Sequence, residues 1–249
     1  MNRGFDDLSH AYSSTQLHRR NRETSDFVEW IGPQPGDSAL DVASGPGTIA
    51  RALAPRVKRT IALDLSHSML LEAKMVGSPA ANLHLTGGDI AALPFHDRVF
   101  DLLTCAYVFA NLRNLPLILR ECVRVVARSG RLAFMDVIAS ENSDEHEHLN
   151  RLESMRSEFY TRIRAQSELL DEFRQSGLQV EKSMCSYGRQ RMVDWLRLSP
   201  ALTGAEVSTA ACLQEIIDFA AKAGLCPQGS GMNVEFRYQT GWFLLRPAL

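Results

Sequence analysis

The sequence predicts an α/β fold with a mostly parallel sheet and helices on both of its faces. Two observations support this prediction. Between residues 26 and 137, short apolar runs that suit buried strands alternate with amphipathic stretches of helical length. One apolar run, residues 39–42, leads directly into a glycine-rich turn and the start of a helix, a connection typical of parallel sheets. This alternation favours right-handed crossovers within one sheet.

Local signals define the elements of residues 26–137. Gly32-Pro33 closes a first helix, Pro116 suits the first turn of a later helix, and Gly130 marks a turn into a strand. We expect strands over 39–42, 60–65, 83–85, 99–105 and 131–137, and helices that end at 31, begin at 48, follow Ser66 and span 116–126.

The pattern changes on either side of this segment. Residues 1–25 are polar and fit either a helical lid or a loose tail, and residues 141–174 are highly charged and helical in character, with a break near Gln166-Ser167. We expect the rest to form a strand over 178–187, helices over 192–198 and 205–223, and a closing strand rich in β-formers over 234–245.

Composition limits the classes of protein to consider. The 249 residues suffice for one elaborated α/β domain or two small ones, and the net charge of −2 offers no basic footprint for nucleic acid. Five cysteines, an odd number without C-x-x-C spacing, suit reduced thiols. There is neither an apolar signal segment at the N-terminus nor an apolar run of the roughly 18 residues that a membrane span needs. We therefore expect a cytoplasmic protein with no nucleic-acid partner and no membrane span.

The glycine-rich turn is the strongest functional signal. Gly45 and Gly47 remove two side chains where the backbone turns tightly, and the helix that starts at Thr48 directs its free N–H groups back at the turn. Asp64, at the end of the second strand, is expected at the same edge of the sheet. These features predict a nucleotide-type site, although an ordinary strand-to-helix loop that needs two glycines is the simpler alternative.

Four segments resemble those of class I S-adenosylmethionine-dependent methyltransferases. Their residues are most similar to the branch that includes the ubiquinone/menaquinone C-methyltransferases (methyltransferase type 11). They are the turn Asp-Val-Ala-Ser-Gly-Pro-Gly at 41–47, Asp64, Gly88-Asp89-Ile90 with Leu93-Pro94-Phe95 beyond it, and Phe-Asp-Leu-Leu-Thr-Cys at 100–105. Ala43 departs mildly from the family, because many members have glycine there. The resemblance is strong over residues 26–137 and weak elsewhere.

The resemblance implies a Rossmann-like sheet of seven strands, mostly parallel, with helices on both faces, an antiparallel last strand and a helical cap. It divides the chain into a lid or tail (1–25), a cofactor-binding core (26–137), a helical substrate cap with a sixth strand (138–233) and a closing strand of the core sheet (234–249). We expect the lid and part of the cap to close over the cofactor, because methyl transfer must exclude water.

The implied cofactor is S-adenosylmethionine, and the residue types suit its groups. Asp41 is placed for the cationic end of the cofactor, Asp64 for two ribose hydroxyls, and Asp89 with the Ile90 backbone for the adenine amino group. For each aspartate alone, a capping or turn role is an equal alternative. The expected cofactor-binding residues are Asp41, Ala43, Ser44, Gly45, Gly47, Asp64, Leu65, Met69, Asp89, Ile90 and Cys105.

Two other classes compete with methyl transfer. An NAD-dependent dehydrogenase is one alternative, since residues 45–50 also satisfy G-x-G-x-x-[G/A] and Asp64 could hold a ribose. Against it, Asp41 would bring negative charge near a pyrophosphate, and Asp89 would have no task at the adenine. The other alternative is a protein that binds S-adenosylmethionine without catalysis.

Catalysis requires little chemistry from the protein, because in-line displacement at a methyl group depends mainly on the alignment of donor and acceptor. Residues 106–111 should face the methyl group. Relatives often carry histidines near Ala110 and Asn111, so their absence leaves any general base open. The candidate catalytic residues are Tyr107, Asn111 and Asp136, of which Asp136 is equally a structural partner.

The acceptor is expected to be a small molecule, and several apolar side chains of the cap suggest that it is partly hydrophobic. These side chains are Met155, Phe159, Tyr160, Met192 and Trp195, which equally suit a core of the cap itself. Candidate lid residues are Tyr12, His18, Tyr160 and Trp195. No metal is expected, since His146 and His148 point about 200° apart on a helix and suit a solvated face.

Overall fold

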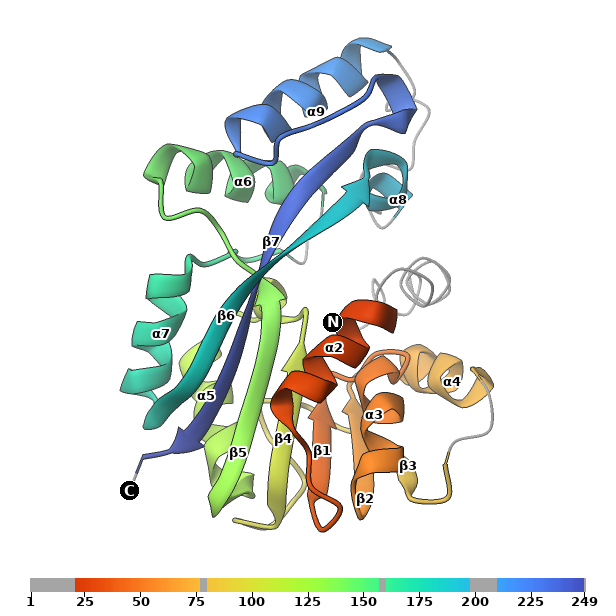
Figure 1. The fold of residues 1–249 in the computed structure, drawn as a ribbon, viewed down its shortest axis with the longest axis vertical. Helices are drawn as coiled ribbons and strands as arrows, with labels where there is room; N and C mark the ends of the chain where they lie inside the picture. The colour runs from red at the N-terminus through yellow and green to blue at the C-terminus, as the bar shows by residue number, and fades with distance from the viewer. Residues whose placement is uncertain (1–20, 77–79, 157–159, 198–209, 249) are drawn as a thin grey trace.

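The computed structural model describes residues 21–76, 80–156, 160–197 and 210–248. Its centre is a seven-stranded sheet in the order β3-β2-β1-β4-β5-β7-β6 (Figure 1). Strands β1 to β5 pair in parallel, and β7 runs antiparallel to both of its neighbours, β5 and β6. The predicted fold class is therefore confirmed, including the antiparallel last strand.

The strands are β1 (Ser38–Val42), β2 (Arg59–Asp64), β3 (Leu83–Gly87), β4 (Phe100–Ala106), β5 (Val126–Val137), β6 (Leu178–Arg191) and β7 (Glu235–Pro247). The α-helices are α2 (Asn21–Ile31), α3 (Thr48–Leu53), α4 (His67–Met75), α5 (Leu115–Val125), α6 (Ser143–Arg156), α7 (Gln166–Gln175), α8 (Met192–Arg197) and α9 (Ala210–Lys222). Short 3₁₀ turns are η1 (Ala54–Arg56), η2 (Phe109–Asn111) and η5 (Gly231–Asn233). Within the described residues, no helix combines the length and the apolar character needed to cross a membrane.

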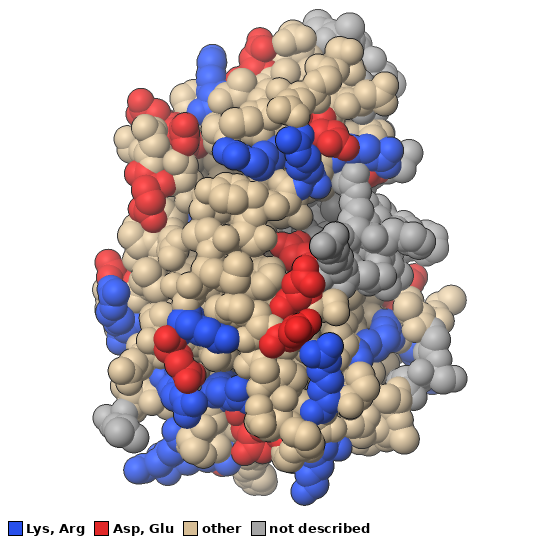
Figure 2. Space-filling view, in the orientation of Figure 1, with Lys and Arg blue, Asp and Glu red and all other residues tan. Residues whose placement is uncertain are grey.

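Apolar side chains fill both faces of the sheet, and we call these buried residues the main core. On one face, α5 and α7 pack against the strands, and the ring of Phe173 stacks on Phe134 with centroids 5.5 Å apart. On the other face, α2 and α3 cover the sheet, and Phe27 meets Trp242 edge to face at 5.4 Å. Helix α2 is amphipathic, because Phe27, Val28 and Ile31 are buried against the sheet while Asp26 and Glu29 are exposed. Acidic side chains gather near the middle of the face shown in Figure 2.

Two excursions of the chain rise above the sheet (Figure 1). The first, residues 139–165, carries α6 and returns to its starting point, where the Ala139 N–H donates to the Arg164 carbonyl oxygen at 2.9 Å. The second, residues 188–239, continues β6 beyond the end of β5, carries α8 and α9, and returns along β7, with Gly188 opposite Tyr238. Each excursion thus leaves and returns at adjacent points.

The two excursions share a hydrophobic core of their own, which we call the cap core. Its fully buried members are Ala139, Leu149, Leu152, Ile163, Met192, Trp195, Leu196, Leu213, Ile216, Ala220, Ala223, Leu225, Val234 and Phe236. Helix α7 lies between the excursions in sequence, yet its Leu169 and Phe173 belong to the main core. The stretch expected as one cap, 138–233, is therefore divided between two cores.

The predicted helical stretch 141–174 forms two helices. Helix α7 begins at Gln166, so the break expected near this residue lies immediately before it. Strand β6 extends four residues beyond the predicted end at Tyr187, because its outer part pairs with β7 all the way to Arg191. The residues of this outer part are mostly polar and at least partly exposed, so the sequence shows no apolar alternation that would predict the extension.

Candidate functional site

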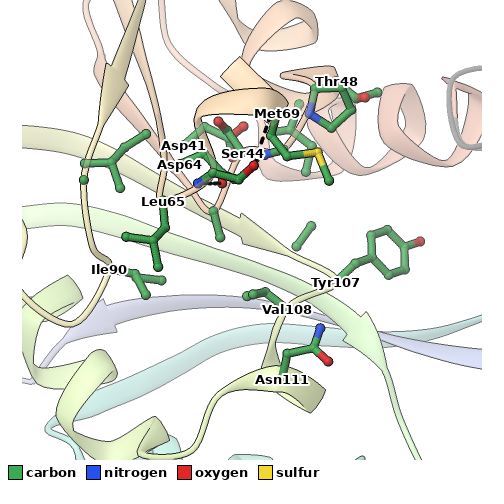
Figure 3. Close-up of a pocket in the computed structure, with 18 of the residues that line it drawn as sticks. Asp41, Ser44, Thr48, Asp64, Leu65, Met69, Ile90, Tyr107, Val108 and Asn111 are labelled. Carbon is green, nitrogen blue, oxygen red and sulfur yellow. Dashed lines mark hydrogen bonds between the residues drawn. The ribbon is translucent and has the colours of Figure 1, made fainter. Parts of the chain in front are cut away.

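A cavity of about 360 Å³ opens at the carboxyl edge of the parallel strands. Figure 3 shows Asp41, Ser44 and Asp64 on one side of it and Tyr107, Val108 and Asn111 on the other. The residues that line it are Thr24, Asp41, Ala43, Ser44, Gly45, Pro46, Thr48, Ile49, Leu63, Asp64, Leu65, Ser66, Met69, Gly88, Asp89, Ile90, Ala106, Tyr107, Val108, Asn111, Leu112 and Arg113.

The glycine-rich turn between β1 and α3 forms one wall of this cavity. Gly45 adopts a φ of 52° with open space where a Cβ would lie, so a ligand can approach its backbone closely. Gly47, with a φ of 75°, is the N-cap of α3 and does not line the cavity. The turn is anchored from behind by Arg51, whose guanidinium donates to the carbonyl oxygens of Pro46 and Ala73.

Asp64 ties two loops of the cavity together. Its Oδ2 accepts from the Gly45 N–H at 2.7 Å, and its Oδ1 accepts from the Ser66 N–H at 2.8 Å. The side chain is thus a turn-stabilising residue as well as part of the wall.

Asp41 lies deeper, at the end of β1. Its Oδ1 accepts from the Thr104 hydroxyl at 2.7 Å, and its Oδ2 accepts from the Ala50 N–H at 3.1 Å. Burial raises the pKa of Asp41 to about 7, against the lowering effect of these two hydrogen bonds. A carboxyl group with this pKa changes its charge near neutral pH, and a cation in the cavity would favour its ionised form.

The remaining predicted contacts lie toward β2 and β3. Met69 and Ile90 are buried, whereas Leu65 is 52% exposed at the mouth of the cavity. Asp89 is exposed, and its Oδ1 accepts from the Ala91 N–H at 2.8 Å, which closes a turn. All four residues line the cavity, including Asp89 and Ile90, which are expected at the adenine amino group.

Ser44 is the clearest sign that the cavity takes a polar ligand. Its hydroxyl oxygen is buried and has no hydrogen-bond partner among the described residues. A buried hydroxyl without a partner is costly, and this residue lines the cavity beside Gly45. A ligand with a polar group at this point, such as the amino-acid end of S-adenosylmethionine, fits the wall.

Two non-glycine residues of the wall have left-handed backbone conformations. Ala43 follows β1 with a φ of 51°, and Tyr107 follows β4 with a φ of 57°. Strands β1 and β4 are neighbours, so the two strained residues lie at adjacent strand ends. Such strain is typical of functional sites, because the surrounding fold must hold it in place.

Three of the predicted site residues do not line the cavity. Gly47 caps α3, as described above, and Cys105 is buried in the main core, where burial raises the pKa of its thiol. The carboxylate of Asp136 accepts from the backbone N–H groups of Val108, Phe109 and Val137 at 2.7–2.8 Å. This favours the structural alternative for Asp136, which holds the loop after β4.

The other catalytic candidates lie in the wall. Tyr107 and Asn111 both line the cavity, as do Ala106 and Val108 of the same loop. The other two residues of the stretch 106–111 do not line it: Phe109 is buried in the main core, and Ala110 packs against the cap core.

The expected pocket residues of the cap lie elsewhere. Trp195 donates its Nε1–H to Glu153 Oε1 at 3.1 Å inside the cap, and Tyr160 donates to Asn150. Met192 is buried in the cap core and Met155 is exposed. No described residue beyond Arg113 lines the cavity. Tyr12, His18 and Phe159 lie outside the described residues.

Sequence reasoning missed several wall residues, of which Thr24 and Arg113 are the most informative. Thr24 is buried in the first turn of α2, and the neighbouring Glu23 holds this turn against β7 by accepting from the Thr240 hydroxyl at 3.1 Å. Arg113 lies in the short loop between η2 and α5. A single threonine in a polar stretch and a single arginine in a loop carry no periodic signal. The other missed residues are Pro46, Thr48, Ile49, Leu63, Ser66, Gly88 and Leu112.

The two histidines of α6 contact backbone atoms. His146 Nε2 lies 2.9 Å from the Ile163 carbonyl oxygen, and His148 Nδ1 lies 2.6 Å from the Asp144 carbonyl oxygen. In the part of the chain that the structure describes, no group of three metal-ligating side chains is present.

Comparison with known proteins supports the resemblance. Residues 40–134 match the model of a family described as "Methyltransferase domain". A ubiquinone/menaquinone biosynthesis C-methyltransferase, UbiE, of Roseobacter denitrificans is 33% identical over 135 residues, which cover 52% of this chain and 53% of that protein. A 2-phytyl-1,4-naphtoquinone methyltransferase of Nostoc sp. PCC 7120 is 33% identical over 138 residues, which cover 53% of this chain and 59% of that protein. The chain thus spans little more than half the length of these relatives.

Solved structures share the fold over most of the chain. A protein of Bacillus halodurans C-125, itself only provisionally described as a methyltransferase, superposes with a TM-score of 0.79 at 23% identity, over 92% of this chain and 100% of that one. The YcgJ protein of Bacillus subtilis gives 0.76 at 21% identity, over 92% and 99%. The resemblance to methyltransferases is therefore confirmed over residues 40–134, and the fold of these solved structures is shared over most of the chain.

Proposed function

We propose that this protein transfers a methyl group from S-adenosylmethionine to a small-molecule acceptor. The observation that carries the proposal is the placement of three carboxylates, Asp41, Asp64 and Asp89, along one cavity beside the glycine-rich turn. The match of residues 40–134 to the methyltransferase family supports it. A dehydrogenase is disfavoured, because the pyrophosphate of NAD would lie against these carboxylates.

The wall of the cavity suits the groups of this cofactor one by one. S-adenosylmethionine supplies a methyl group bonded to a sulfonium. Asp64 supplies a carboxylate in the wall for the ribose hydroxyls, and Asp41 supplies negative charge for the cationic end, next to the Ser44 hydroxyl that lacks a partner among the described residues. Leu65, Met69 and Ile90 supply apolar surface for the adenine ring.

Catalysis in this proposal rests on positioning. Among the described cavity residues there is no histidine, and the carboxylates line the end assigned to the cofactor. Tyr107, Val108 and Asn111 face that end across the cavity (Figure 3) and would hold the acceptor in line with the methyl group. Apolar side chains near them would exclude water during transfer.

The names of the relatives suggest where to look for the acceptor. One relative acts in ubiquinone/menaquinone biosynthesis and another is named for 2-phytyl-1,4-naphtoquinone. For this chain we propose an acceptor with an aromatic or quinone-type ring, which suits a cavity that combines Tyr107, Val108 and Leu112 with a few polar groups.

Titration calorimetry with S-adenosylhomocysteine and with NAD tests the cofactor. We expect saturable micromolar binding of S-adenosylhomocysteine and none of NAD. D64N should weaken that binding by about 1.5–3 kcal/mol, the value of hydrogen bonds to a charged group. D101N is the matched control, because Asp101 also accepts from a backbone amide, Ser38 N–H at 2.9 Å, but at the opposite end of the sheet.

The control separates a binding role from a structural one, since both variants lose a carboxylate that holds a backbone amide. Equal affinity loss in D64N and D101N would show that Asp64 acts through the fold. Saturable binding of NAD without binding of S-adenosylhomocysteine would overturn the proposal. Methylation of a co-purified ligand, followed by mass spectrometry, then separates an enzyme from a protein that only binds the cofactor.

A further inference from the structure

Charge changes sign along the cavity. The order of strands at this edge is β3-β2-β1-β4, and Asp89, Asp64 and Asp41 lie at or after the ends of the first three. Arg113 follows β4 and η2, and it is the one lysine or arginine among the described wall residues. The cavity is thus acidic along β3, β2 and β1 and basic beyond β4.

The guanidinium of Arg113 is available to a ligand. It makes no ion pair or hydrogen bond with the described residues, whereas Arg124, on the following helix, is held by Glu121 and Asp97 at 2.8 Å. Arg113 also lies one residue before Asn114, the N-cap of α5, and the N-terminal end of this helix carries partial positive charge. Exposed arginines are common, but this one forms part of a cavity wall.

The surroundings of Arg113 suit a flat ring. In the same loop, Val108 and Leu112 supply apolar surface to the wall, Tyr107 supplies a ring, and Asn111 supplies an amide. A carboxylate or phenolate would be repelled by Asp41, Asp64 and Asp89 at the other end. Among the described wall residues, Arg113 is therefore the one whose side-chain charge favours an anionic oxygen on the acceptor.

We infer that the acceptor is a ring compound with an anionic oxygen, carboxylate or phenolate, that Arg113 binds. This inference rests on the proposed function, because it assigns the acidic end of the cavity to the cofactor. It extends that function in one respect: the acceptor is selected by charge, and Arg113 is the residue that determines this specificity.

The test uses the full chain saturated with S-adenosylhomocysteine and two probes, benzoate and 4-nitrophenol. The anion of 4-nitrophenol is coloured, so its ionisation is followed by absorbance as the pH is raised. The wild-type protein should bind benzoate and should lower the apparent pKa of 4-nitrophenol, with the anion bound about tenfold more tightly than the neutral phenol, as expected for a charge-assisted hydrogen bond. Asp41, Asp64, Asp89 and Tyr107 are the other titratable wall residues, and they do not favour an anion.

R113Q should abolish both effects and leave the affinity for S-adenosylhomocysteine unchanged. R120Q is the matched control, because Arg120 is an exposed arginine of α5 outside the cavity wall. If R113Q behaves as wild type, or if the wild type binds neither probe, the inference is wrong. If R113Q instead weakens S-adenosylhomocysteine, Arg113 binds the carboxylate of the cofactor and the inference is also wrong. Failure of S-adenosylhomocysteine to bind the wild type would overturn the proposed function itself.

Discussion

The main core and the cap core are packed in the same way but relate differently to the cavity. Both are closed clusters of buried apolar side chains. Every described cavity residue comes from the first half of the chain, up to Arg113, while the cap core supplies none. The family model likewise ends at residue 134, before the first excursion begins. The wall of the cavity and the core of the cap thus come from separate parts of the described chain, so each can be tested by its own substitutions.

The largest expected effect comes from the main core. F173A removes a ring that is fully buried and contacts the rings of Phe134, Phe243 and Phe109. We expect a loss of about 3–5 kcal/mol in the free energy of unfolding, measured by urea denaturation. Cavity residues and strands should lose hydrogen-exchange protection together. A loss below about 1 kcal/mol would mean that α7 is not an integral part of the main core.

A matched truncation in the cap core should leave the cofactor site intact. I216A removes a buried side chain of α9, and we expect a cost of about 2–4 kcal/mol that is confined to the excursions. Hydrogen exchange should accelerate in α6 and α9, while the affinity for S-adenosylhomocysteine stays at the wild-type value. Weaker binding of S-adenosylhomocysteine by I216A would show that the two cores are coupled, and the expectation that they are separable would be wrong.

The pH dependence of cofactor binding examines the deepest part of the cavity. With a pKa of about 7, Asp41 is mostly neutral at pH 6 and mostly ionised at pH 8. If the ionised form holds the cationic end of the cofactor, the affinity for S-adenosylhomocysteine should rise about tenfold over this range, measured by calorimetry. D41N should remove the rise; an unchanged slope in D41N would assign the titration to another group.

The same group affects the stability of the free protein with a defined sign. Because the folded state raises the pKa of Asp41 above its ordinary 3.8, the folded protein binds more protons than the unfolded chain between pH 4 and 7. Asp41 therefore destabilises the fold as the pH rises through this window, and the penalty is complete above about pH 7. The melting temperature of D41N relative to wild type should increase from pH 4 to pH 7. The opposite trend would contradict the assigned shift.

The smallest expected effect concerns backbone strain. Ala43 has a φ of 51°, which glycine adopts without steric cost. A43G should therefore stabilise the protein by about 0.5–1 kcal/mol, after allowance for the greater freedom of glycine in the unfolded chain. Thermal denaturation measures the change. A destabilisation would mean that the methyl group of Ala43 contributes packing that outweighs the strain.

Much of the main core was predictable because its signals are local. The strand 39–42, the turn at Gly45 and the three aspartates at strand ends all follow from short stretches whose patterns match parallel strands and their loops. The order of these strands places their ends at one edge, so the residues at one wall of the cavity could be named in advance. Cys105 was misplaced because a residue at a strand end faces either the core or the edge, and one side chain's direction is not visible in the sequence.

The cap was less predictable because its contacts are distant in sequence. The cap core contains residues from both excursions, 139–165 and 188–239. Because these segments are far apart in the sequence, no local pattern predicts that they pack together. The outer part of β6 has polar residues on both sides, so its length depends on pairing with β7. Thr24 and Arg113 reach the cavity for the same reason: the positions of α2 and of the loop after β4 are set by tertiary packing.

The adjacent ends of each excursion have a consequence for how such a protein can change. Ala139 lies beside Ala165, and Gly188 lies opposite Tyr238, so either segment can be replaced by another of different length without moving the strands below it. The sheet and the cavity form a constant part of the chain, and the two excursions form parts whose length can vary. The cavity wall, which comes from residues between Thr24 and Arg113, therefore stays in place when either excursion changes in length.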